Sequence, residues 1–480
     1  MKKYILIILC CLTSFPLWSY NVNMIVEHYS VDQGLPNNTV NCTLKDRDGF
    51  IWFGTWYGLC CFDGVKFKTF NKQEHDSDVP PRKIQRIVED KNGYIWVKTI
   101  DRKLYVFNKV TECFHAVYDD MKNYSENIQV IKLQNTAEGD VLLLTKDKNL
   151  LLAGVDEKGQ VTIKILFDSR DEINKHDYTL KHHVLCETEE YISWIGTDYK
   201  VSAVHKGAEL ASRPADFITS KINSGDKDSF TSFFEDGRKV WVGDRAGIFY
   251  SIDVRTGLVN RYVLSEIKGA ISNLLVTPAG YVYLSVAGQG TYEYDLAERR
   301  LQKINTEMND AMVTHAFIDQ YDKIWFHENE KALIYYDPLN HTAKRFPFTM
   351  FGKITTLYSE DAGERGLFFL SPAGEAWLFD REHAEMVYIN KLKQLSNDRA
   401  NQQFYHLMLD NDGVLWLSSA DEGVYCMNFP KKQFNLLSLS PQSAGRENYA
   451  TGVRALFQSK VAISGWAPVG RVFIGWTGTV

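Results

Sequence analysis

The sequence predicts an all-β fold: a seven-bladed β-propeller of four-stranded blades, followed by about three blades of an incomplete second propeller. One observation is a short apolar strand that recurs along the chain at spacings of 42 to 57 residues. The other is a turn rich in Asp, Asn and Gly before most of these strands. A period of about 40 to 50 residues is typical of propeller blades, and no helical periodicity interrupts the pattern.

The N-terminal residues 1–19 predict a signal peptide. Lys2 and Lys3 precede an apolar run from Tyr4 to Leu12, and Ser19 is a small residue suited to cleavage. A membrane anchor is the alternative, but this run is shorter than the roughly 20 apolar residues that a membrane span needs. We therefore expect export to the periplasm.

The first repeat shows all four strands of a blade. A strand that begins at Val40 leads into the turn DRDG, and Asp and Gly favour such turns because they tolerate positive φ. The strand of Trp52, the strand GLCCFD and the strand that begins at Phe67 follow. Residues 26–31 resemble the last strand of a repeat and have no blade of their own. We expect them to complete the last blade of the first ring.

Later repeats keep this order. The strand of Trp52 has counterparts at Trp96, Leu142, Trp194, Trp241, Tyr283, Trp325, Phe368, Trp416 and Phe473. Seven of these ten anchors precede residue 340, so we expect residues 20–340 to form the first propeller and residues 341–480 the partial second one. Large aromatic residues at one repeated position are typical of packing between blades. We expect the tryptophans to form core, not a sugar-stacking surface.

Charge and cysteine content exclude several function classes. The net charge is −6, and basic residues form no stripe, so we expect no nucleic-acid partner. The cysteines after the signal peptide are Cys42, Cys60, Cys61, Cys113, Cys186 and Cys426. They form no CxxC motif, so no zinc or redox site is indicated, and most are expected to be small buried hydrophobic residues.

No catalytic motif is present. The chain has no GxSxG, HExxH or P-loop sequence. The turn that begins at Asp46 resembles the start of a calcium loop, but Tyr57 stands where such a loop needs a bidentate Glu. We expect no catalytic residue, no metal and no cofactor. A glycosidase remains an alternative, because its two carboxylates need only meet in space.

Candidate ligand-binding residues follow the second strand of several repeats. In a propeller, the turns between second and third strands open on one face together with the segments that join blades. Polar and aromatic residues that vary from blade to blade suit a binding rim on this face. The candidates are Trp56, Tyr57, Asp101, Arg102, Asp198, Tyr199 and Arg245.

Two stretches resemble a known family. GLPNNTVNCTLKDRDGFIWFGTWYGLCCFDGVKFKTFN and GVYCMNFPKKQFNLLSLSP are similar to the two-component regulator propeller repeats of Bacteroidetes hybrid two-component sensors. The resemblance implies the periplasmic sensor region of such a protein, truncated before its kinase, with an oligosaccharide ligand and a homodimeric state. A membrane contact would come only through C-terminal regions missing here. An exported glycan hydrolase or lyase and a protein-interaction platform are the alternatives.

Overall fold

The computed structural model describes residues 25–70, 80–122, 129–146, 149–167, 180–187, 190–196, 201–206, 215–216, 230–304, 313–328, 331–347, 358–361, 366–371, 376–389, 404–428, 453–458, 463–468 and 474–477. It divides into two compact units, Met1–Asn428 and Phe429–Val480. The expected signal peptide and the candidates Asp198 and Tyr199 lie outside the described residues.

Unit 1 contains nine four-stranded antiparallel sheets within the described residues, numbered here in chain order. Sheet 1 is β2 (Val40–Lys45), β3 (Ile51–Thr55), β4 (Gly58–Phe62) and β5 (Phe67–Phe70). Sheet 2 is β6 (Ile84–Glu89), β7 (Ile95–Thr99), β8 (Leu104–Asn108) and β9 (Cys113–Ala116). Sheet 3 is β10 (Val130–Asn135), β11 (Val141–Thr145), β12 (Leu150–Val155) and β13 (Val161–Phe167).

Sheets 4 to 6 continue this order. Sheet 4 is β14 (Leu180–Glu187), β15 (Tyr191–Gly196), β16 (Val201–His205) and β17 (Ala215–Asp216). Sheet 5 is β18 (Phe230–Glu235), β19 (Lys239–Asp244), β20 (Ile248–Asp253) and β21 (Val259–Val263). Sheet 6 is β22 (Ile271–Val276), β23 (Tyr281–Val286), β24 (Gly290–Asp295) and β25 (Arg300–Lys303).

The last three sheets complete unit 1. Sheet 7 is β26 (Val313–Ile318), β27 (Ile324–Glu328), β28 (Ala332–Asp337) and β29 (Thr342–Pro347). Sheet 8 is β30 (Tyr358–Asp361), β31 (Leu367–Leu370), β32 (Ala376–Asp380) and β33 (Glu385–Ile389). Sheet 9 is β34 (Phe404–Leu409), β35 (Leu415–Ser419), β36 (Val424–Asn428) and the N-terminal β1 (Ile25–Tyr29). Two short helices, η1 (Val31–Gln33) and α2 (Tyr118–Met121), lie between strands.

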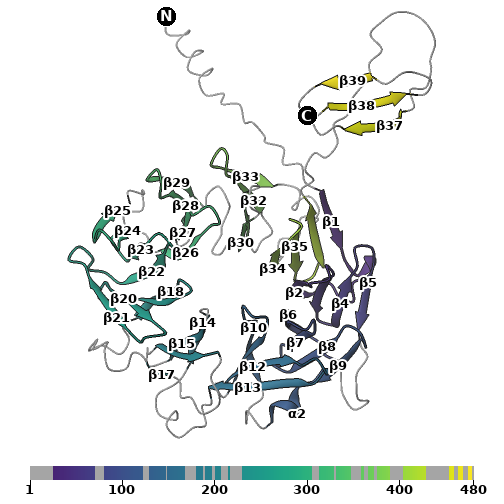
Figure 1. Cartoon of the computed structure of the whole chain (residues 1–480), viewed down its shortest axis with the longest axis horizontal. Coiled ribbons are helices and arrows are strands. Elements are labelled where there is room, and N and C mark those ends of the chain that lie inside the picture. The colour runs from purple at the N-terminus through teal and green to yellow at the C-terminus, as the bar shows by residue number, and fades with distance from the viewer. Residues whose placement is uncertain are drawn as a thin grey trace, which may run out of the picture. The chain divides into compact units, whose positions relative to one another are not determined.

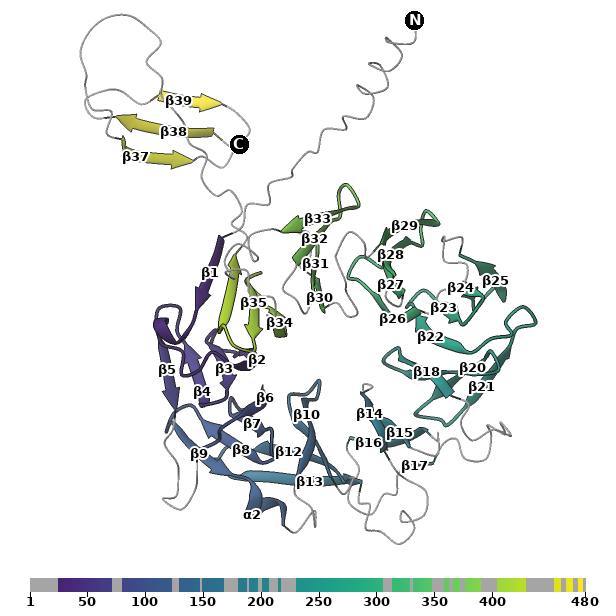
Figure 2. The same cartoon turned by 180° about the vertical axis from the view of Figure 1, so that it is seen from behind.

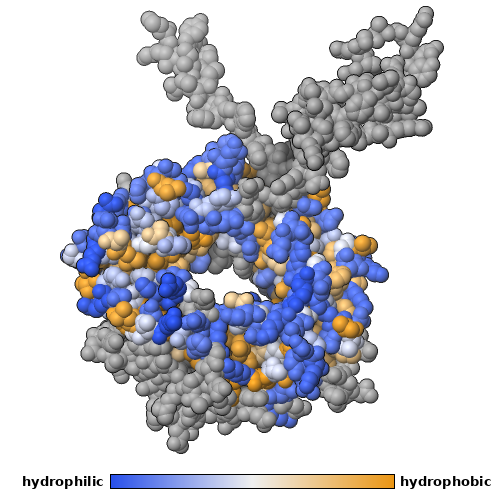
Figure 3. Space-filling model, in the orientation of Figure 1, coloured by the Kyte–Doolittle hydropathy of each residue, from blue (hydrophilic) through white to orange (hydrophobic). Residues whose placement is uncertain are grey.

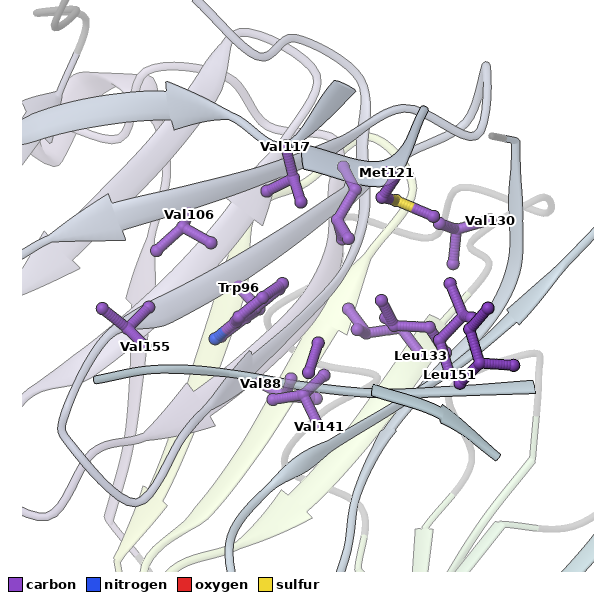
Figure 4. Close-up of a cluster of buried hydrophobic side chains, with 14 residues drawn as sticks. Val88, Trp96, Val106, Val117, Met121, Val130, Leu133, Val141, Leu151 and Val155 are labelled. Carbon is purple, nitrogen blue, oxygen red and sulfur yellow. The ribbon is translucent and has the colours of Figure 1, made fainter. Parts of the chain in front are cut away.

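The nine sheets follow one another around a ring, with the first strand of each sheet innermost, as Figures 1 and 2 show from opposite sides. Neighbouring sheets share apolar clusters. Figure 4 shows one such cluster, which contains Trp96 of sheet 2 together with Val141 and Leu151 of sheet 3. Similar clusters join sheet 9 to sheet 1 and then each sheet to the next, as far as sheet 8. Contacts between β30 and β34 join sheet 8 to sheet 9. The core is therefore a closed series of interfaces between sheets.

The all-β propeller fold and its four-stranded sheets are confirmed, but the place of ring closure is corrected. The N-terminal strand does complete a sheet, yet its partner is β36 and not a strand of the Trp325 sheet, as expected for a seven-sheet ring. His28 also stacks on Tyr425 with ring centroids 4.4 Å apart. Sheets 8 and 9 therefore belong to the first ring, and the boundary expected near residue 340 falls inside it. The repeat period carries no information on how many sheets close a ring.

Unit 2 contains a single three-stranded antiparallel sheet within its described residues. Its strands are β37 (Val453–Gln458), β38 (Ile463–Pro468) and β39 (Ile474–Thr477). The expected second ring of about three blades is represented there by this one sheet.

The repeated tryptophans whose side chains the structure describes are core residues, as expected, and each donates its indole N–H. These are Trp52, Trp96, Trp241, Trp325 and Trp416. Trp52 donates to Asp46 over 2.8 Å and Trp96 to Asp90 over 2.9 Å. The other Asp46 oxygen accepts the backbone N–H groups of Asp48 and Phe50, which fixes the turn. The same indole–carboxylate pair recurs in sheets 5, 7 and 9. One carboxylate thus ties a hairpin turn to a buried anchor and satisfies a donor that would otherwise be costly to bury.

Small residues let adjacent sheets approach near the channel. A Cβ added to Gly54 would lie 2.6 Å from Cγ2 of Ile84, the first residue of the next inner strand. Gly243 of sheet 5 meets Ile271 of sheet 6 at 2.7 Å in the same way. This position, two residues after the anchor, is therefore tightly constrained where it faces the neighbouring inner strand.

Candidate ligand-binding face

One face of the ring, called here the loop face, carries the turns after the second strands and the segments that join successive sheets. Backbone hydrogen bonds connect these loops. The N–H of Trp56 donates to Thr39 O over 3.2 Å, and that of Lys83 donates to Trp56 O over 2.9 Å. The N–H of Ile100 then donates to Lys83 O, and that of Val130 to Arg102 O, each over 2.9 Å. The loop face between sheets 1 and 3 is thus a continuous hydrogen-bonded frame.

Trp56 and Tyr57 lie on this face in sheet 1, and both are exposed, by 41% and 63%. The ammonium of Lys83 lies 5.3 Å from the centre of the Trp56 ring. The N–H of Tyr57 donates to Thr55 Oγ1 over 3.1 Å. Two aromatic side chains are therefore presented to solvent on an ordered turn, as a contact surface requires.

Asp101 and Arg102 line a pocket of about 400 Å³ at the loop-face end of sheet 2. Tyr105, Tyr118 and Gln129 contribute further polar and aromatic atoms to its wall. Arg102 has a φ of +68°, a left-handed conformation that is uncommon for residues other than glycine. The pocket combines ring faces with donors and acceptors.

The short helix α2 forms one side of this pocket. Its Met121 is 1% exposed and joins the apolar cluster between sheets 2 and 3, as Figure 4 shows. Tyr118, at the other end of α2, is 55% exposed. The ammonium of Lys122 lies 4.9 Å from the centre of the Tyr118 ring. The buried Met121 therefore anchors the helix while Tyr118 remains available at the pocket wall.

Asp101 is held in its ionised form. Burial acts to raise its pKa, but the hydrogen bond from Thr99 Oγ1, 2.5 Å long, and the charge of Lys103 outweigh burial and lower the pKa. The Lys103 ammonium lies 3.4 Å from Asp101 Oδ2. An ionised carboxylate can accept hydrogen bonds from a ligand but is poorly suited to donate a proton.

Arg245 is exposed on the turn between β19 and β20, also on the loop face. Asp244 holds that turn by accepting the N–H groups of Ala246 and Ile248. The described candidates thus share a face, but only Asp101 and Arg102 line a common pocket, and Arg245 belongs to sheet 5.

Sequence reasoning missed the residues that border the central channel, which Figure 3 shows as an opening through unit 1. Exposed side chains on the innermost strands include Gln85, Arg86, Thr231, His315 and Tyr405. They follow the first, mostly buried residue of each inner strand, where the pairing with the next strand shifts register. The repeated polar pair at this point of the first strand was the available signal.

The opposite face carries a cluster of three carboxylates. Oxygen atoms of Asp46, Asp48 and Glu89 lie within 4.8 Å of one another. The Lys109 ammonium contacts them at 3.1, 2.6 and 2.8 Å, respectively. Although burial acts to lower it, the pKa of Lys109 is raised by these carboxylates. Lys109 contacts all three carboxylates and Arg47 pairs with Glu89, so the cluster joins sheets 1 and 2 by ion pairs, and we assign it a structural role.

A second pocket, of about 460 Å³, lies at that opposite end of sheets 2 and 3. Its wall includes Tyr94, Cys113, His115 and Gln160. His115 Nε2 lies 2.7 Å from Asp120 Oδ2, which also lines the pocket. None of the candidate residues predicted from the sequence lines this pocket.

Residues 34–57 match the family model described as two component regulator propeller. Comparison with curated proteins finds no significant match. The turn DRDG, the anchor Trp52 and the exposed pair Trp56 and Tyr57 all fall within the matched stretch.

Similar solved structures include two extracellular domains from B. thetaiotaomicron. One is described as part of a one component system, with 13% identity, a TM-score of 0.35, and coverage of 82% of this chain and 65% of that one. The other is described as part of a hybrid two component system, with 14% identity, a TM-score of 0.33, and coverage of 94% and 65%. The chain thus spans about 65% of the length of these domains.

A third similar structure is the Dos1 propeller, with 11% identity, a TM-score of 0.43, and coverage of 84% of this chain and 93% of that one. Within the part of the chain that is described, no helix is long and apolar enough to cross a membrane.

Proposed function

Because residues 34–57 carry a two-component regulator propeller repeat, we propose that this chain is the ligand-sensing region of a two-component signalling protein. Its ligand is an oligosaccharide, bound on the loop face at the pocket of Asp101, Arg102 and Tyr118. The observation that carries the proposal is this pocket of about 400 Å³ with its aromatic and charged wall.

The size and chemistry of the pocket support a sugar ligand. Pockets for small molecules range from about 300 to 1,000 Å³ and combine apolar surface with a few polar groups. The Tyr118 ring can stack on the apolar face of a sugar ring. The Asp101 carboxylate can accept, and the Arg102 guanidinium can donate, hydrogen bonds to hydroxyl groups. Both charged residues sit on a turn held by backbone hydrogen bonds.

The same pocket favours binding over hydrolysis. A glycosidase uses two carboxyl groups about 5 to 9.5 Å apart, one of them protonated. Asp101 is the one carboxylate among the described residues that line this pocket, and its pKa is lowered. A binding role without turnover is therefore proposed.

Export to the periplasm is part of the proposal. Lys2, Lys3 and the apolar run that follows have the pattern of a signal peptide, and two of the similar structures are extracellular domains. The expected homodimer stays a prediction.

Titration calorimetry against a panel of glycan oligosaccharides tests the function. We expect stoichiometric heat with one member and no change in the sugar recovered afterwards. Tyr118→Ala, and separately Trp56→Ala with Tyr57→Ala, should weaken binding at least tenfold. Tyr321→Ala, a 42% exposed tyrosine on the opposite face, is the matched control and should bind normally. Release of shorter saccharides would show that the chain is an enzyme and not a sensor. The absence of binding heat with every member of the panel would refute a saccharide ligand.

A further inference from the structure

Lys98 is a buried cation in the channel wall between sheets 2 and 3. It lies on β7, and its residue is 6% exposed. Its ammonium donates to Gln85 Oε1 on the inner strand β6 over 2.7 Å and to Ile131 O on the inner strand β10 over 2.6 Å. An ammonium has three N–H donors, and among the described residues these two neutral acceptors are the hydrogen-bond partners of Lys98.

Further cations surround this ammonium. Burial, with the charges of Arg102 and Arg86 acting in the same direction, lowers the pKa of Lys98 to about 8. Lys132 follows on β10, one residue after Ile131. In the described part of the chain, no carboxylate lies within ion-pairing distance of Lys98, Arg86 or Arg102. Within the described residues, the charges of Lys98, Arg86 and Arg102 therefore have no carboxylate partner.

Arg86 brings this charge into the channel. It is exposed on the innermost strand of sheet 2. Its charge also lowers the pKa of His406 on β34, the innermost strand of sheet 9, where burial is the larger cause. The charge of the Arg86 guanidinium therefore lowers the pKa of groups in both sheet 2 and sheet 9.

The fold itself does not need a cation at this position. In the strand register, Arg86 lies opposite Lys98. The equivalent pairs in sheets 1 and 5 are Cys42 with Gly54 and Ser232 with Gly243. The residues in the place of Lys98 in other sheets include Gly54, Leu144, Gly243, Ser285, His327 and Ser418. Small or neutral side chains therefore serve the same packing role. An uncompensated buried charge costs stability, so its presence in sheet 2 alone indicates a role in binding.

We propose that the channel wall between β6 and β10 binds the carboxylate or sulfate group of an acidic saccharide through Arg86, Lys98 and Arg102. Arg86 and Arg102 approach the anion from solvent, and Lys98 offers its remaining N–H from the wall. Arg102 also lines the loop-face pocket, so the anionic group of a ligand in that pocket has a cationic surface beside it. This inference rests on the proposed saccharide function and narrows it to acidic sugars.

Calorimetry at pH 7 with the purified chain tests the anion site, using matched probes. These are trigalacturonate, a sulfated chondroitin disaccharide, neutral galactotriose, and inorganic sulfate at constant ionic strength. An acidic saccharide should bind at least tenfold more tightly than galactotriose. Arg86→Gln and Lys98→Met should each lower the ratio of the affinity for the acidic saccharide to that for galactotriose at least tenfold. Lys268→Gln, an exposed lysine on the loop face of sheet 6, is the matched control and should bind as the unchanged chain does.

Proton uptake gives a second readout that a packing role would not produce. Because the pKa of Lys98 is lowered to about 8, part of the Lys98 population is neutral at pH 8, so an anion that fixes the charge should draw a fraction of a proton per site. Titration in two buffers of different ionisation enthalpy measures this uptake, and Lys98→Met should abolish it. Near-ultraviolet circular dichroism of each variant establishes that the ring is folded.

The outcomes separate the two proposals. Neutral saccharides that bind as tightly as acidic ones, unaffected by Arg86→Gln, would overturn the anion site and leave the saccharide sensor standing. If the chain binds sulfate but no saccharide, and Arg86→Gln abolishes the sulfate binding, the anion site is upheld and the saccharide function is refuted. A clear preference for trigalacturonate or for the sulfated disaccharide identifies which anionic group is recognised.

Discussion

Ring closure by β1 can be tested with one introduced cysteine. Glu27 of β1 lies directly opposite Cys426 of β36 in the strand register. Paired residues of antiparallel strands have Cα atoms about 4.5 to 5.5 Å apart, within the range that a disulfide spans. Glu27→Cys should therefore form a disulfide with the native Cys426 when the chain folds under oxidising conditions.

The expected stabilisation follows from the length of chain that the bond encloses. Residues 27 to 426 form a loop of 400 residues, for which the chain-entropy relation gives about 6 kcal/mol at 25 °C. With an unfolding entropy of about 2.1 cal/mol/K per residue over this loop, that corresponds to a rise of about 7 °C in the thermal midpoint. We take these values as the upper bound, since distortion of the strands subtracts from them.

The thiol of Cys426 is slow to react, which shapes the assay. Burial raises its pKa to about 12, and the charges of Glu27 and Asp410 act in the same direction. Because the thiolate is the reactive form, the bond should be formed during oxidative refolding and then located by peptide mapping without reduction. Thermal melts with and without reductant measure its contribution.

Val26→Cys is the matched control, because successive side chains of a strand point to opposite faces and Val26 pairs with Met427. It should remain reduced. Closure onto the sheet of Trp325 would place residue 27 beside β28, whose residues Ala332–Asp337 include no cysteine. A Glu27→Cys chain that folds but stays reduced, or bonds to a cysteine other than Cys426, would refute closure through β36.

Two further predictions concern the repeat and the pH dependence of stability. Asp90→Ala removes the acceptor of the buried Trp96 indole and of two turn N–H groups, so the denaturant midpoint should reflect a loss of about 3 kcal/mol. Asp156→Ala, in a similar turn without an indole partner, should cost clearly less, and equal losses would contradict a special role for the indole pair. Burial and Arg86 lower the pKa of His406 to about 4, so its neutral form favours folding above pH 6.5, and that contribution is lost as the pH falls towards 4. His406→Gln should flatten the fall in thermal midpoint between pH 6.5 and 4, and an unchanged acid profile would contradict this assignment.

The local structure of this protein was predictable because it depends on neighbours in sequence. The turn DRDG and the anchor Trp52 are six residues apart counted from Asp46, and the same spacing recurs at Asp90, Asp319 and Asp410. Turn chemistry and strand alternation act within one repeat, so the strands and their order were evident. The constant spacing of six residues between Asp and Trp could also have predicted the hydrogen bond between the carboxylate and the indole. Sequence reasoning instead assigned the tryptophans to apolar packing alone.

The face that carries the candidate residues followed from the repeat, because the turns after the second strands lie on one face of the ring. Trp56, Tyr57, Asp101, Arg102 and Arg245 are on that face, and their role in ligand binding stays a prediction. The pocket, however, also needs α2 and Gln129 from the segment that joins sheets 2 and 3. The sequence of that segment does not follow the alternating strand pattern of the repeat, so periodicity offered no signal for it.

By itself, the sequence determined the all-β repeat, the turns and the anchors, since each depends on residues within about 45 positions of one another. Tertiary structure alone decided where the ring closes, because β1 pairs with β36 and His28 hydrogen bonds to the backbone oxygen of Glu422, 394 residues along the chain. It also decided the burial and the surroundings of Lys98, which the sequence of its own strand does not reveal. The packing of β6 against β10 buries the Lys98 ammonium among neutral acceptors and near other cations, because burial and charge depend on neighbours that the chain brings together from different sheets.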